Sequence, residues 1–390
     1  MTEHMSKKVA IVLVNYKDYA EKYLADCIDS IRQQDFSGEI KVFIVDNETS
    51  EESYEYLKNV LTTHNKEIPQ TPFIKGAEWE IIRNKTNDGF AKGNNDAMKQ
   101  ALEQGFDYIV LFNIDTVVEK NCVSEMVKVA ENKILDSPPA FAGAKGRGND
   151  ELEIGAVQAR IMLWPDKDKI NSLGNVTHFL GFGYSEGYGR ELSSEYSELS
   201  SLKEICYPSG AAVLFKAEVL KQVGLFDEEM WMYNEDQDLG WRIWLAGFRC
   251  VLAPQAVVYH KYEFNRSIKK YYWMDRNRII TMLKNYHWAT IALIVPACLL
   301  MEIGLLFFST QNGWFKEKMN VYKYFLSIKN WQYILRVRKQ VQTTRKVKDK
   351  DIVRLFSGKI WYQEIGDNSL KIANLFFNAY LHIVKVLIRW

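Results

Sequence analysis

Short runs of β-branched and aliphatic residues alternate with segments of helical spacing in the first part of the chain, and this alternation restricts the fold more than any other feature. The apolar runs are residues 9–14, 40–45, 79–83 and 108–112, and the helical segments between them are residues 21–34, 51–63 and 93–104. Strands that alternate with helices form βαβ units and a parallel sheet. The sequence therefore predicts an α/β fold with a doubly wound, mostly parallel sheet.

Polar residues directly follow each of the four predicted strands. A doubly wound sheet binds its ligands at the carboxyl ends of its strands. One polar strand end would be ordinary turn chemistry, but four at the same sheet edge favour a ligand site. Gly89 and Gly93 would let the backbone approach a ligand closely. Neither a GxGxxG pattern after the first strand nor a GxxxxGK[ST] pattern is present, so a nucleotide would be bound in another manner.

A second polar group lies in the region up to His260. Three carboxylates fall within residues 235–238, at the start of a predicted helix that ends at Gly247. The helix dipole favours anions in a first turn, so a simple structural role is one interpretation of these carboxylates. His260 follows two apolar runs that we expect to be short strands, residues 250–253 and 256–259. Its position at a strand end favours a ligand role.

In this order, the motifs resemble those of family 2 glycosyltransferases with the GT-A fold, and the rhamnosyltransferase-like members in particular. The resemblance spans about residues 8–262. Residues 154–190 are similar to the insert of a subgroup that acts on membrane-linked glycans. The motifs are Val14-Asn15-Tyr16, Val45-Asp46-Asn47, Asn87 to Asn95, Phe112 to Thr116, Pro208 to Ala212, Phe226-Asp227, Glu235 to Arg242, and Val258-Tyr259-His260.

The resemblance implies that Asp236 is the catalytic base. A base needs a pKa near the working pH, and we expect repulsion from Glu235 and Asp238 to raise that of Asp236. Arg242 is expected to pair with one of these carboxylates. The residues expected on the acceptor or sugar side are Ser209, Gly210, Trp231, Glu235, Asp238 and Arg242.

The resemblance also implies a divalent metal, Mg²⁺ or Mn²⁺, held by Asp115 and His260. One carboxylate, one imidazole and phosphate oxygens would suit either ion. Asn113 replaces the first carboxylate of the family's Asp-x-Asp motif, which weakens the inference. The residues expected to bind the nucleotide-sugar donor are Asn15, Asp46, Asn47, Asn87, Gly89, Gly93, Asn94 and Asn113.

The implied activity is inverting transfer of a hexose-type sugar from a UDP- or dTDP-linked donor, with dTDP-rhamnose among the candidates, to a lipid-linked or polysaccharide acceptor. A sugar nucleotidylyltransferase would need a Gly-rich loop with Arg where this chain has Asn15 to Asp18. A processive synthase would need several membrane spans and a Gln-x-x-Arg-Trp motif, and Arg389-Trp390 lacks the Gln. A non-catalytic nucleotide-sugar-binding protein is the remaining alternative, and the presence of Asp236 and His260 argues against it.

A net charge of +1 conceals an asymmetry between the two parts of the chain. Residues 1–260 carry 27 basic and 41 acidic side chains, whereas residues 261–390 carry 23 basic and 8 acidic ones. A basic end indicates an anionic surface as partner. Because nothing in this end resembles a nucleic-acid module, we expect an anionic lipid surface and no nucleic acid.

Two further features bear on the compartment. The five cysteines are scattered without a CxxC pair, which is typical of buried thiols in a reducing environment. The apolar run after Lys7 and Lys8 is too short for a signal peptide. We therefore expect the protein at the cytoplasmic face of the cell membrane, in a peripheral or re-entrant position.

Residues 288–308 are long and apolar enough to span a bilayer. Pro296 and Glu302 lie within this segment, and a carboxylate is costly in lipid. Both flanks are rich in Lys and Arg, as cytoplasmic flanks are. These features favour a re-entrant or interfacial hairpin over a single span or a buried pair of helices.

The end of the chain predicts an amphipathic helix. Its polar residues recur every three or four positions and form one stripe on an otherwise apolar helix. Such a helix suits a membrane interface with its stripe toward lipid phosphates, and docking on the protein's own apolar segment is the alternative. The domains expected are a catalytic domain at 1–262, with a nucleotide-sugar half at about 1–120 and an acceptor half at about 121–262, and a basic helical membrane-association region at 263–390. The stripe comprises Lys371, Asn374, Asn378, His382, Lys385 and Arg389.

Overall fold

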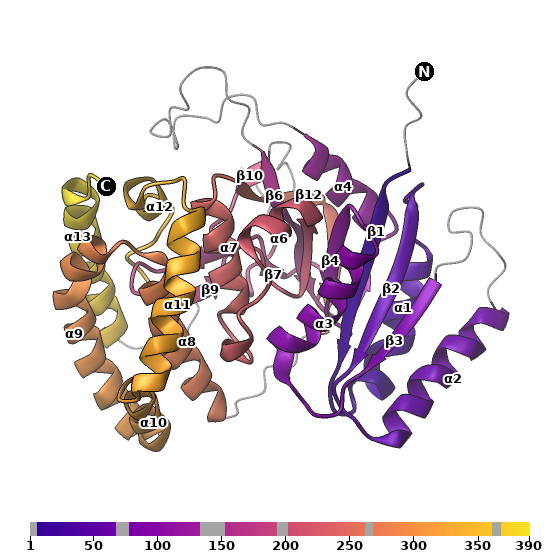
Figure 1. The fold of residues 1–390 in the computed structure, drawn as a ribbon, viewed down its shortest axis with the longest axis horizontal. Coiled ribbons are helices and arrows are strands. Elements are labelled where there is room, and N and C mark those ends of the chain that lie inside the picture. Colours follow the sequence, from indigo (N-terminus) through magenta and orange to yellow (C-terminus); the bar gives the residue numbers. More distant parts are fainter. Residues whose placement is uncertain (1–5, 68–77, 133–152, 193–201, 262–267, 361–367) are drawn as a thin grey trace.

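The structure is a computed structural model, and most of the chain is described in it. The predicted domain boundary at residue 262 lies outside the described residues. Within the described residues, ten strands form one sheet whose main path runs β10-β12-β6-β11-β4-β1-β2-β3 (Figure 1). The described residues are 6–67, 78–132, 153–192, 202–261, 268–360 and 368–390.

The first half of the sheet is parallel, as predicted. β1 (Lys8–Asn15) lies between β2 (Glu39–Asp46) and β4 (Tyr108–Phe112), and β3 (Glu78–Arg83) pairs with β2. The register aligns Asn15 with Asp46, which brings the two strand ends together. The surrounding helices are η1 (Ala20–Leu24), α1 (Ala25–Arg32), α2 (Glu51–Glu67), α3 (Gly89–Glu103) and α4 (Cys122–Glu131).

The second half makes the sheet mixed, which corrects the mostly parallel expectation. β11 (Ala212–Lys216) is antiparallel to both of its neighbours, β4 and β6 (Ile154–Leu163). The two short strands expected before His260 are one strand, β12 (Arg249–His260), with a register shift between Ala253 and Val257. A proline at 254 cannot donate to the ladder, which is consistent with an irregularity there. The other elements here are β5 (Thr116–Val118), β7 (Ile170–Ser172), β8 (Asn175–Thr177), β9 (Gly183–Ser185), β10 (Lys203–Glu204), α6 (Ala217–Val223), η3 (Glu228–Met230) and α7 (Glu235–Leu245).

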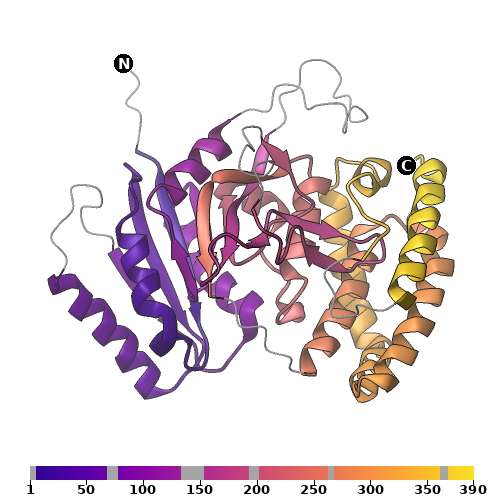
Figure 2. The same ribbon diagram turned by 180° about the vertical axis from the view of Figure 1, so that it is seen from behind.

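Helices make up the described part of the C-terminal region. α8 packs against α7, α10 and α11, so this region is continuous with the α/β fold. α9 and α13 lie side by side at the edge of the molecule farthest from β3 (Figures 1 and 2). Both are long and apolar enough to cross a membrane, by length and composition. The helices are α8 (Lys269–Asn285), α9 (Trp288–Gln311), α10 (Phe315–Phe325), α11 (Ile328–Thr344), α12 (Asp349–Val353) and α13 (Asn368–Leu387).

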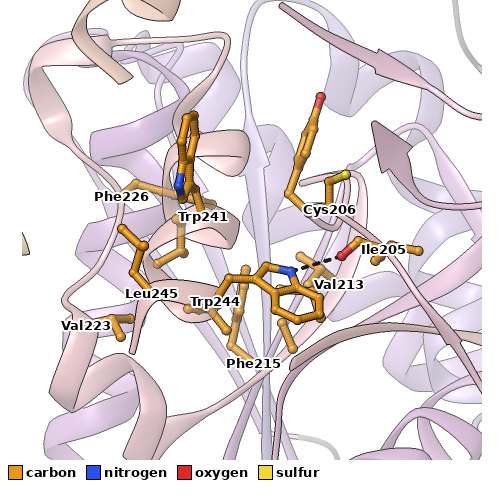
Figure 3. Close-up of a cluster of buried hydrophobic side chains, with 14 of the residues drawn as sticks. Ile205, Cys206, Val213, Phe215, Val223, Phe226, Trp241, Trp244 and Leu245 are labelled. Atoms are coloured by element: carbon orange, nitrogen blue, oxygen red, sulfur yellow. Dashed lines mark hydrogen bonds between the residues drawn. The ribbon is translucent and has the colours of Figure 1, made fainter. Parts of the chain in front are cut away.

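α7 packs between the sheet and the C-terminal helices. Trp244 lies in the apolar cluster of Figure 3, where its indole nitrogen donates to the carbonyl of Ile205 at 3.1 Å. On another side of α7, Trp241 makes edge contacts with Tyr286 and Phe356, each at 4.6 Å between ring centroids. Two large apolar contacts therefore fix the helix that carries the carboxylates at 235–238.

Candidate active site

The ends of β1 and β2 form one hydrogen-bonded unit. The side chain of Asn15 donates to Asp46 Oδ1 at 3.0 Å and to Ser53 Oγ at 2.9 Å, and Ser53 Oγ donates to the same carboxylate oxygen at 2.9 Å. Asn15 and Asp46 are fully buried. Asp46 Oδ2 is buried and accepts no hydrogen bond from the described residues. An unpaired buried acceptor at this sheet edge is suited to the N–H group of a ligand.

The asparagines that follow β2 and β3 form hydrogen bonds with one another and with the start of α3. Asn47 donates to the carbonyl of Gly89 at 3.0 Å and accepts from Asn84 at 2.7 Å. Asn87 accepts from the Gly89 amide at 3.0 Å, which starts the helix, and Asn94 donates to a carbonyl one turn earlier in α3. Sequence reasoning did not single out Asn84, although its place directly after a strand is the signal that identified the others.

The two glycines serve close packing within the protein. Gly89 has φ +82°, and a Cβ there would lie 2.5 Å from the Trp231 ring. A Cβ on Gly93 would lie 2.6 Å from the side-chain nitrogen of Asn47. The close approach expected at these positions is therefore made by Trp231 and Asn47, which brings the loop before α7 against the start of α3.

Asp115 and His260 are brought together by the pairing of β5 with β12. His260 Nε2 lies 3.2 Å from Asp115 Oδ1, and both side chains are buried. His260 Nδ1 lies 3.2 Å from the Asn171 carboxamide oxygen, and the side-chain nitrogen of Asn113 lies 3.5 Å from Nε2. Asn171 was not among the expected site residues, because its motif indicated only the subgroup.

Asp115 and His260 could bind a divalent cation, provided that further ligands come from a bound molecule or from water. If Nδ1–H donates to Asn171, the lone pair of Nε2 faces the carboxylate of Asp115, and a cation or a proton between them is needed to stabilise that arrangement. No group of three or more His, Cys, Asp or Glu side chains able to hold a metal is present in the described part of the chain. An ion bound here would thus complete its coordination with oxygens of a ligand or water.

Asp236 lies at the start of α7, next to the strand end that carries Asn113. Its Oδ2 accepts from the Gly210 amide at 3.3 Å, and its Oδ1 accepts from the amide of the next residue at 2.7 Å. Ala211, beside Gly210, accepts from the Asn113 amide at 3.0 Å. Ser209 is held by its own amide, which donates to Gln158 at 2.8 Å. The turn 209–211 therefore joins the predicted base to the strand end that leads to Asp115.

Burial raises the pKa of Asp236 to about 6, although the hydrogen bonds from backbone amides lower it. This corrects the expectation that repulsion from Glu235 and Asp238 causes the shift. The pKa of Glu235 is raised well above its usual range, first by burial and then by the charge of Asp236. An acid with a pKa near 6 can accept a proton at neutral pH, as a general base must.

The loop before Asp236 has an unusual backbone that α8 holds in place. Trp231, Tyr233 and Asn234 all have positive φ, between 59° and 66°. Such conformations cost roughly 1 to 3 kcal/mol each and persist where the surroundings enforce them. The Asn277 carboxamide nitrogen is fully buried and lies within 3.0 Å of the carbonyl oxygens of residues 230, 232 and 233. Trp231 also stacks on Trp273 of α8, at 5.0 Å between ring centroids.

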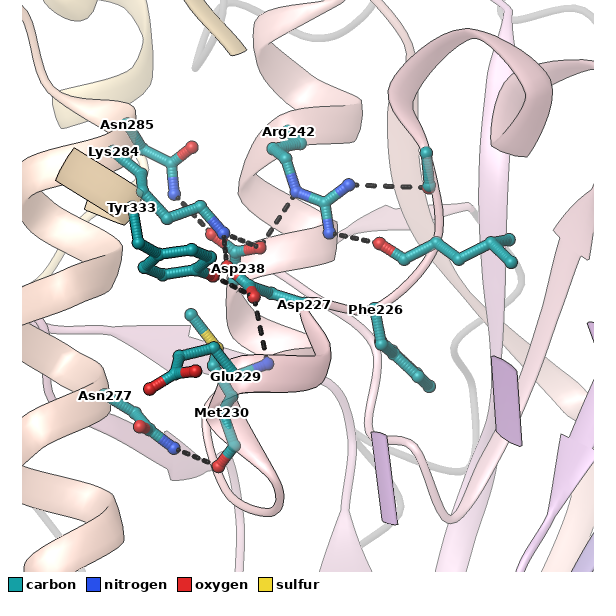
Figure 4. A network of polar contacts seen from close by, with 12 residues as sticks. Phe226, Asp227, Glu229, Met230, Asp238, Arg242, Asn277, Lys284, Asn285 and Tyr333 are labelled. Carbon is teal, nitrogen blue, oxygen red and sulfur yellow. Dashed lines mark hydrogen bonds and ion pairs between the residues drawn. The ribbon is translucent and has the colours of Figure 1, made fainter. Parts of the chain in front are cut away.

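Asp238 and Arg242 belong to a buried ion-pair network, in contrast to the sugar-side position expected for them. Asp238 accepts from Arg242 at 2.8 Å, from Lys284 at 2.9 Å and from Asn285 at 3.0 Å (Figure 4). Burial alone would raise the pKa of Asp238, but the charges of Lys284 and Arg242 hold it below its usual range. Lys284 also pairs with Asp227. We therefore assign these residues to the contact between α7 and α8.

Comparison with solved structures bears on the fold. The crystal structure of GalNAc-T7 with UDP, GalNAc and Mn²⁺ is similar with a TM-score of 0.50 and 12% identity, over 72% of this chain and 48% of that one. The structure of residues 1–349 of S. aureus TarS has a TM-score of 0.47 and 15% identity, over 97% and 90%. At 12% identity, the similarity to GalNAc-T7 is one of fold alone, and it agrees with the GT-A fold expected from the sequence.

The sequence comparisons bear on the family. Residues 9–185 match glycosyl transferase family 2, which confirms the resemblance inferred from the motifs. The N-acetylglucosaminyl-diphospho-decaprenol L-rhamnosyltransferases of two Mycobacterium tuberculosis strains are 42% identical over 60 residues, which is 15% of this chain. The match spans 20% of the length of these relatives.

Proposed function

We propose that the protein is an inverting glycosyltransferase that moves a sugar from a nucleoside-diphosphate donor to a hydroxyl group of a lipid-linked or polysaccharide acceptor. The observation that carries the proposal is the position of Asp236. Its pKa is raised to about 6, and the turn 209–211 connects it to the strand end that leads to the Asp115–His260 pair. A proton acceptor and a candidate cation site thus belong to one sheet edge.

The reaction would proceed as a single displacement. Asp236 accepts the proton of the acceptor hydroxyl while the hydroxyl oxygen forms a bond to the anomeric carbon. The bond from that carbon to the diphosphate oxygen breaks, and its electron pair leaves with the nucleoside diphosphate. Because the attack comes from the face opposite the leaving group, the anomeric configuration inverts.

Binding of the donor is assigned to the ends of β1, β2 and β3. The free acceptor Asp46 Oδ2 and the asparagines Asn15 and Asn47 suit a nucleobase, and the start of α3 lies near enough for the ribose and diphosphate. Asp115 and His260 would hold Mg²⁺ or Mn²⁺, which acts as a Lewis acid on the charge that develops on the diphosphate. The GalNAc-T7 structure, which contains UDP and Mn²⁺, supports this use of the fold.

The acceptor and the sugar are proposed from the curated relative. Its name describes rhamnosyl transfer to N-acetylglucosaminyl-diphospho-decaprenol, which supports a rhamnose donor and a lipid-linked acceptor. We place the enzyme at the cytoplasmic face of the membrane, as expected from the sequence. A lipid-linked acceptor also agrees with the apolar helices α9 and α13.

A donor and acceptor screen tests the proposal. The purified full chain is incubated with single nucleotide-sugars and membrane lipid extracts, and products are identified by mass spectrometry. We expect one glycolipid product whose formation stops in EDTA and resumes with Mg²⁺ or Mn²⁺. Asp236→Asn should abolish transfer but retain donor binding, while Asp166→Asn, on an exposed turn, should leave both unchanged. Normal turnover by Asp236→Asn, or in EDTA, would refute the assigned roles.

A further inference from the structure

The polar stripe of α13 is divided: Asn374 is buried and Asn378 and Lys385 are half-buried against the protein, whereas Lys371, His382 and Arg389 are exposed. Asn374 is buried, donates to the carbonyl of Ile360 at 2.9 Å and accepts from the Ile360 amide at 2.8 Å. Lys385 donates to the carbonyl of Phe356 at 3.2 Å. A Cβ on Gly358 would lie 2.5 Å from the Asn378 backbone, so the helix packs tightly on this segment. Main-chain groups of residues 356–360 thus satisfy or contact the middle of the stripe.

Large apolar side chains of α13 consequently point away from the protein. Leu375 is 75% exposed and Ile372 is 72% exposed, and Ile383 and Val386 are exposed in the next turns. Phe377, Leu381, Val384 and Ile388 are buried against the protein, so this end of the chain carries large apolar side chains on both sides, whereas a surface helix of a soluble protein presents polar residues to water. The surroundings of this outer face are therefore expected to be apolar.

α9 has the same arrangement. Its one carboxylate, Glu302, points inward, where it pairs with Arg278 and, at 2.5 Å, with Lys318. Asp275 lies 2.7 Å from each of these cations and completes a buried network of two anions and two cations. This network explains how a carboxylate occurs in so apolar a helix. It also holds α9 on the catalytic fold, so lipid cannot surround the helix.

The outer side of α9 presents exposed apolar residues four positions apart. Leu299, Ile303 and Phe307 are each at least 60% exposed, and Val295 precedes them on the same side. The two helices are in contact, and the Tyr380 hydroxyl donates to the carbonyl of Leu293 at 2.8 Å. Their exposed sides form what we call the outer face, defined by Val295, Leu299, Ile303, Phe307, Ile372, Leu375, Ile383 and Val386.

Cations gather where α9 begins and α13 ends. A hollow at this end is lined by His287, Arg345, Lys346, Lys348 and Trp390, with Val347 between the lysines. Arg345 pairs with Asp349, but no carboxylate of the described residues pairs with Lys346 or Lys348, and both lysines are exposed. Lys346 also lies over the Phe248 ring, with Nζ 5.8 Å from the ring centroid. Exposed apolar helices together with cations that no described carboxylate neutralises match a lipid layer, whose phosphates lie beside its hydrocarbon.

We propose that the outer face inserts into one leaflet of a bilayer that contains anionic lipid, with Lys346 and Lys348 at the lipid phosphates. Because the inner sides of both helices are bound to the protein, the helices lie in the leaflet and do not cross it. The inference extends the proposed function, on which it rests only for the placement of the enzyme at a membrane. It assigns the membrane contact to one surface and excludes a spanning helix.

Flotation of the full chain with liposomes tests this assignment. One set of vesicles contains phosphatidylcholine alone, and a second contains added phosphatidylglycerol. We expect the wild type to bind both, and the anionic vesicles more tightly. Ile303→Glu and Leu375→Glu should each weaken binding to both sets at least tenfold, because a charge enters hydrocarbon. Ile268→Glu, at an exposed isoleucine outside the two helices, is the matched control and should bind as the wild type does.

The role of Lys346 and Lys348 is tested by the dependence of binding on anionic lipid. Lys346→Gln and Lys348→Gln should each lower the affinity for anionic vesicles about fivefold, which is about 1 kcal/mol, and leave binding to neutral vesicles unchanged. Binding that survives Ile303→Glu and Leu375→Glu would overturn the proposal. So would a dimer that dissociates when Ile303→Glu is introduced, because a second copy would then cover the face. Sugar transfer to a soluble acceptor distinguishes the two proposals, since both glutamate variants should retain it.

Discussion

Replacement of Asn277 by alanine removes the donor that holds the loop before Asp236. The side chain has two N–H groups, and three carbonyl oxygens lie within 3.0 Å of its nitrogen. A hydrogen bond to a buried carbonyl contributes roughly 1 to 1.5 kcal/mol, so the loss of two donors should cost about 3 kcal/mol of folding stability. The positive φ values at three of the four residues 231–234 together cost about 3 to 9 kcal/mol, which is at least as much, so the loop should relax when its bonds are removed.

Relaxation of the loop should affect turnover more than donor binding. The loop runs directly into Asp236, and misplacement of a catalytic group by about 1 Å can lower the rate on the order of 100-fold. We therefore expect Asn277→Ala to lower kcat by about 100-fold with little change in the Kd of the nucleotide-sugar. Asp46 and Asn47, which we assign to the donor, make no contact with Asn277 among the hydrogen bonds of the described residues.

The assay combines steady-state transfer kinetics, donor titration and urea unfolding. Asn330→Ala is the matched control, because Asn330 makes one bond, to the carbonyl of Tyr324 at 2.8 Å, in the same region but away from the loop. It should cost about 1 kcal/mol and leave kcat unchanged. If Asn277→Ala loses about 3 kcal/mol and retains normal kcat, Asn277 stabilises the fold without positioning the base, and the reasoning is wrong.

Two further predictions concern buried charges. Because burial raises the folded-state pKa of Asp236 to about 6, its contribution to stability is fully present below about pH 4 and is lost as the pH rises through 6. Asp236→Asn should therefore have the higher Tm at pH 8 and a similar Tm at pH 4, and wild-type kcat should fall below about pH 6; a pH-independent difference in Tm would contradict this. Lys318→Met should cost about 3 to 5 kcal/mol in chemical unfolding, because it leaves Asp275 and Glu302 with Arg278 alone, and adding Glu302→Gln should restore most of the loss. A double variant less stable than the single one would contradict that explanation.

Local sequence signals were sufficient for the strands and for several strand-end residues. Four β-branched runs became β1 to β4 within a residue or two, because buried parallel strands are apolar throughout and end at polar turns. The same signal marked Asn15, Asp46 and Asp115, since the carboxyl ends of parallel strands share one edge. The antiparallel position of β11 was not predictable, because a strand's apolar pattern does not specify its direction.

The roles within the carboxylate cluster depended on what approaches from distant parts of the chain. Sequence spacing treats Glu235, Asp236 and Asp238 alike, as three acids in one first turn. Lys284 and Asn285 of α8 neutralise Asp238, while Asp236 has only backbone donors and keeps a raised pKa. Their different electrostatic environments exist only after α8 has packed on α7.

The sequence by itself determined the α/β class, the motifs that resemble family 2 glycosyltransferases and the amphipathic nature of the last helix. These properties follow from periodicity and residue type, which are local. The tertiary structure decided which side of that helix faces the protein, because Asn374 and Lys385 form hydrogen bonds with main-chain groups of residues 356–360. It also decided that Glu302 is paired and that Asn277 holds the loop before Asp236. The orientation of α13, the pairing of Glu302 and the bonds of Asn277 depend on residues that are distant in the chain, and the spacing of residues along a sequence does not reveal such contacts.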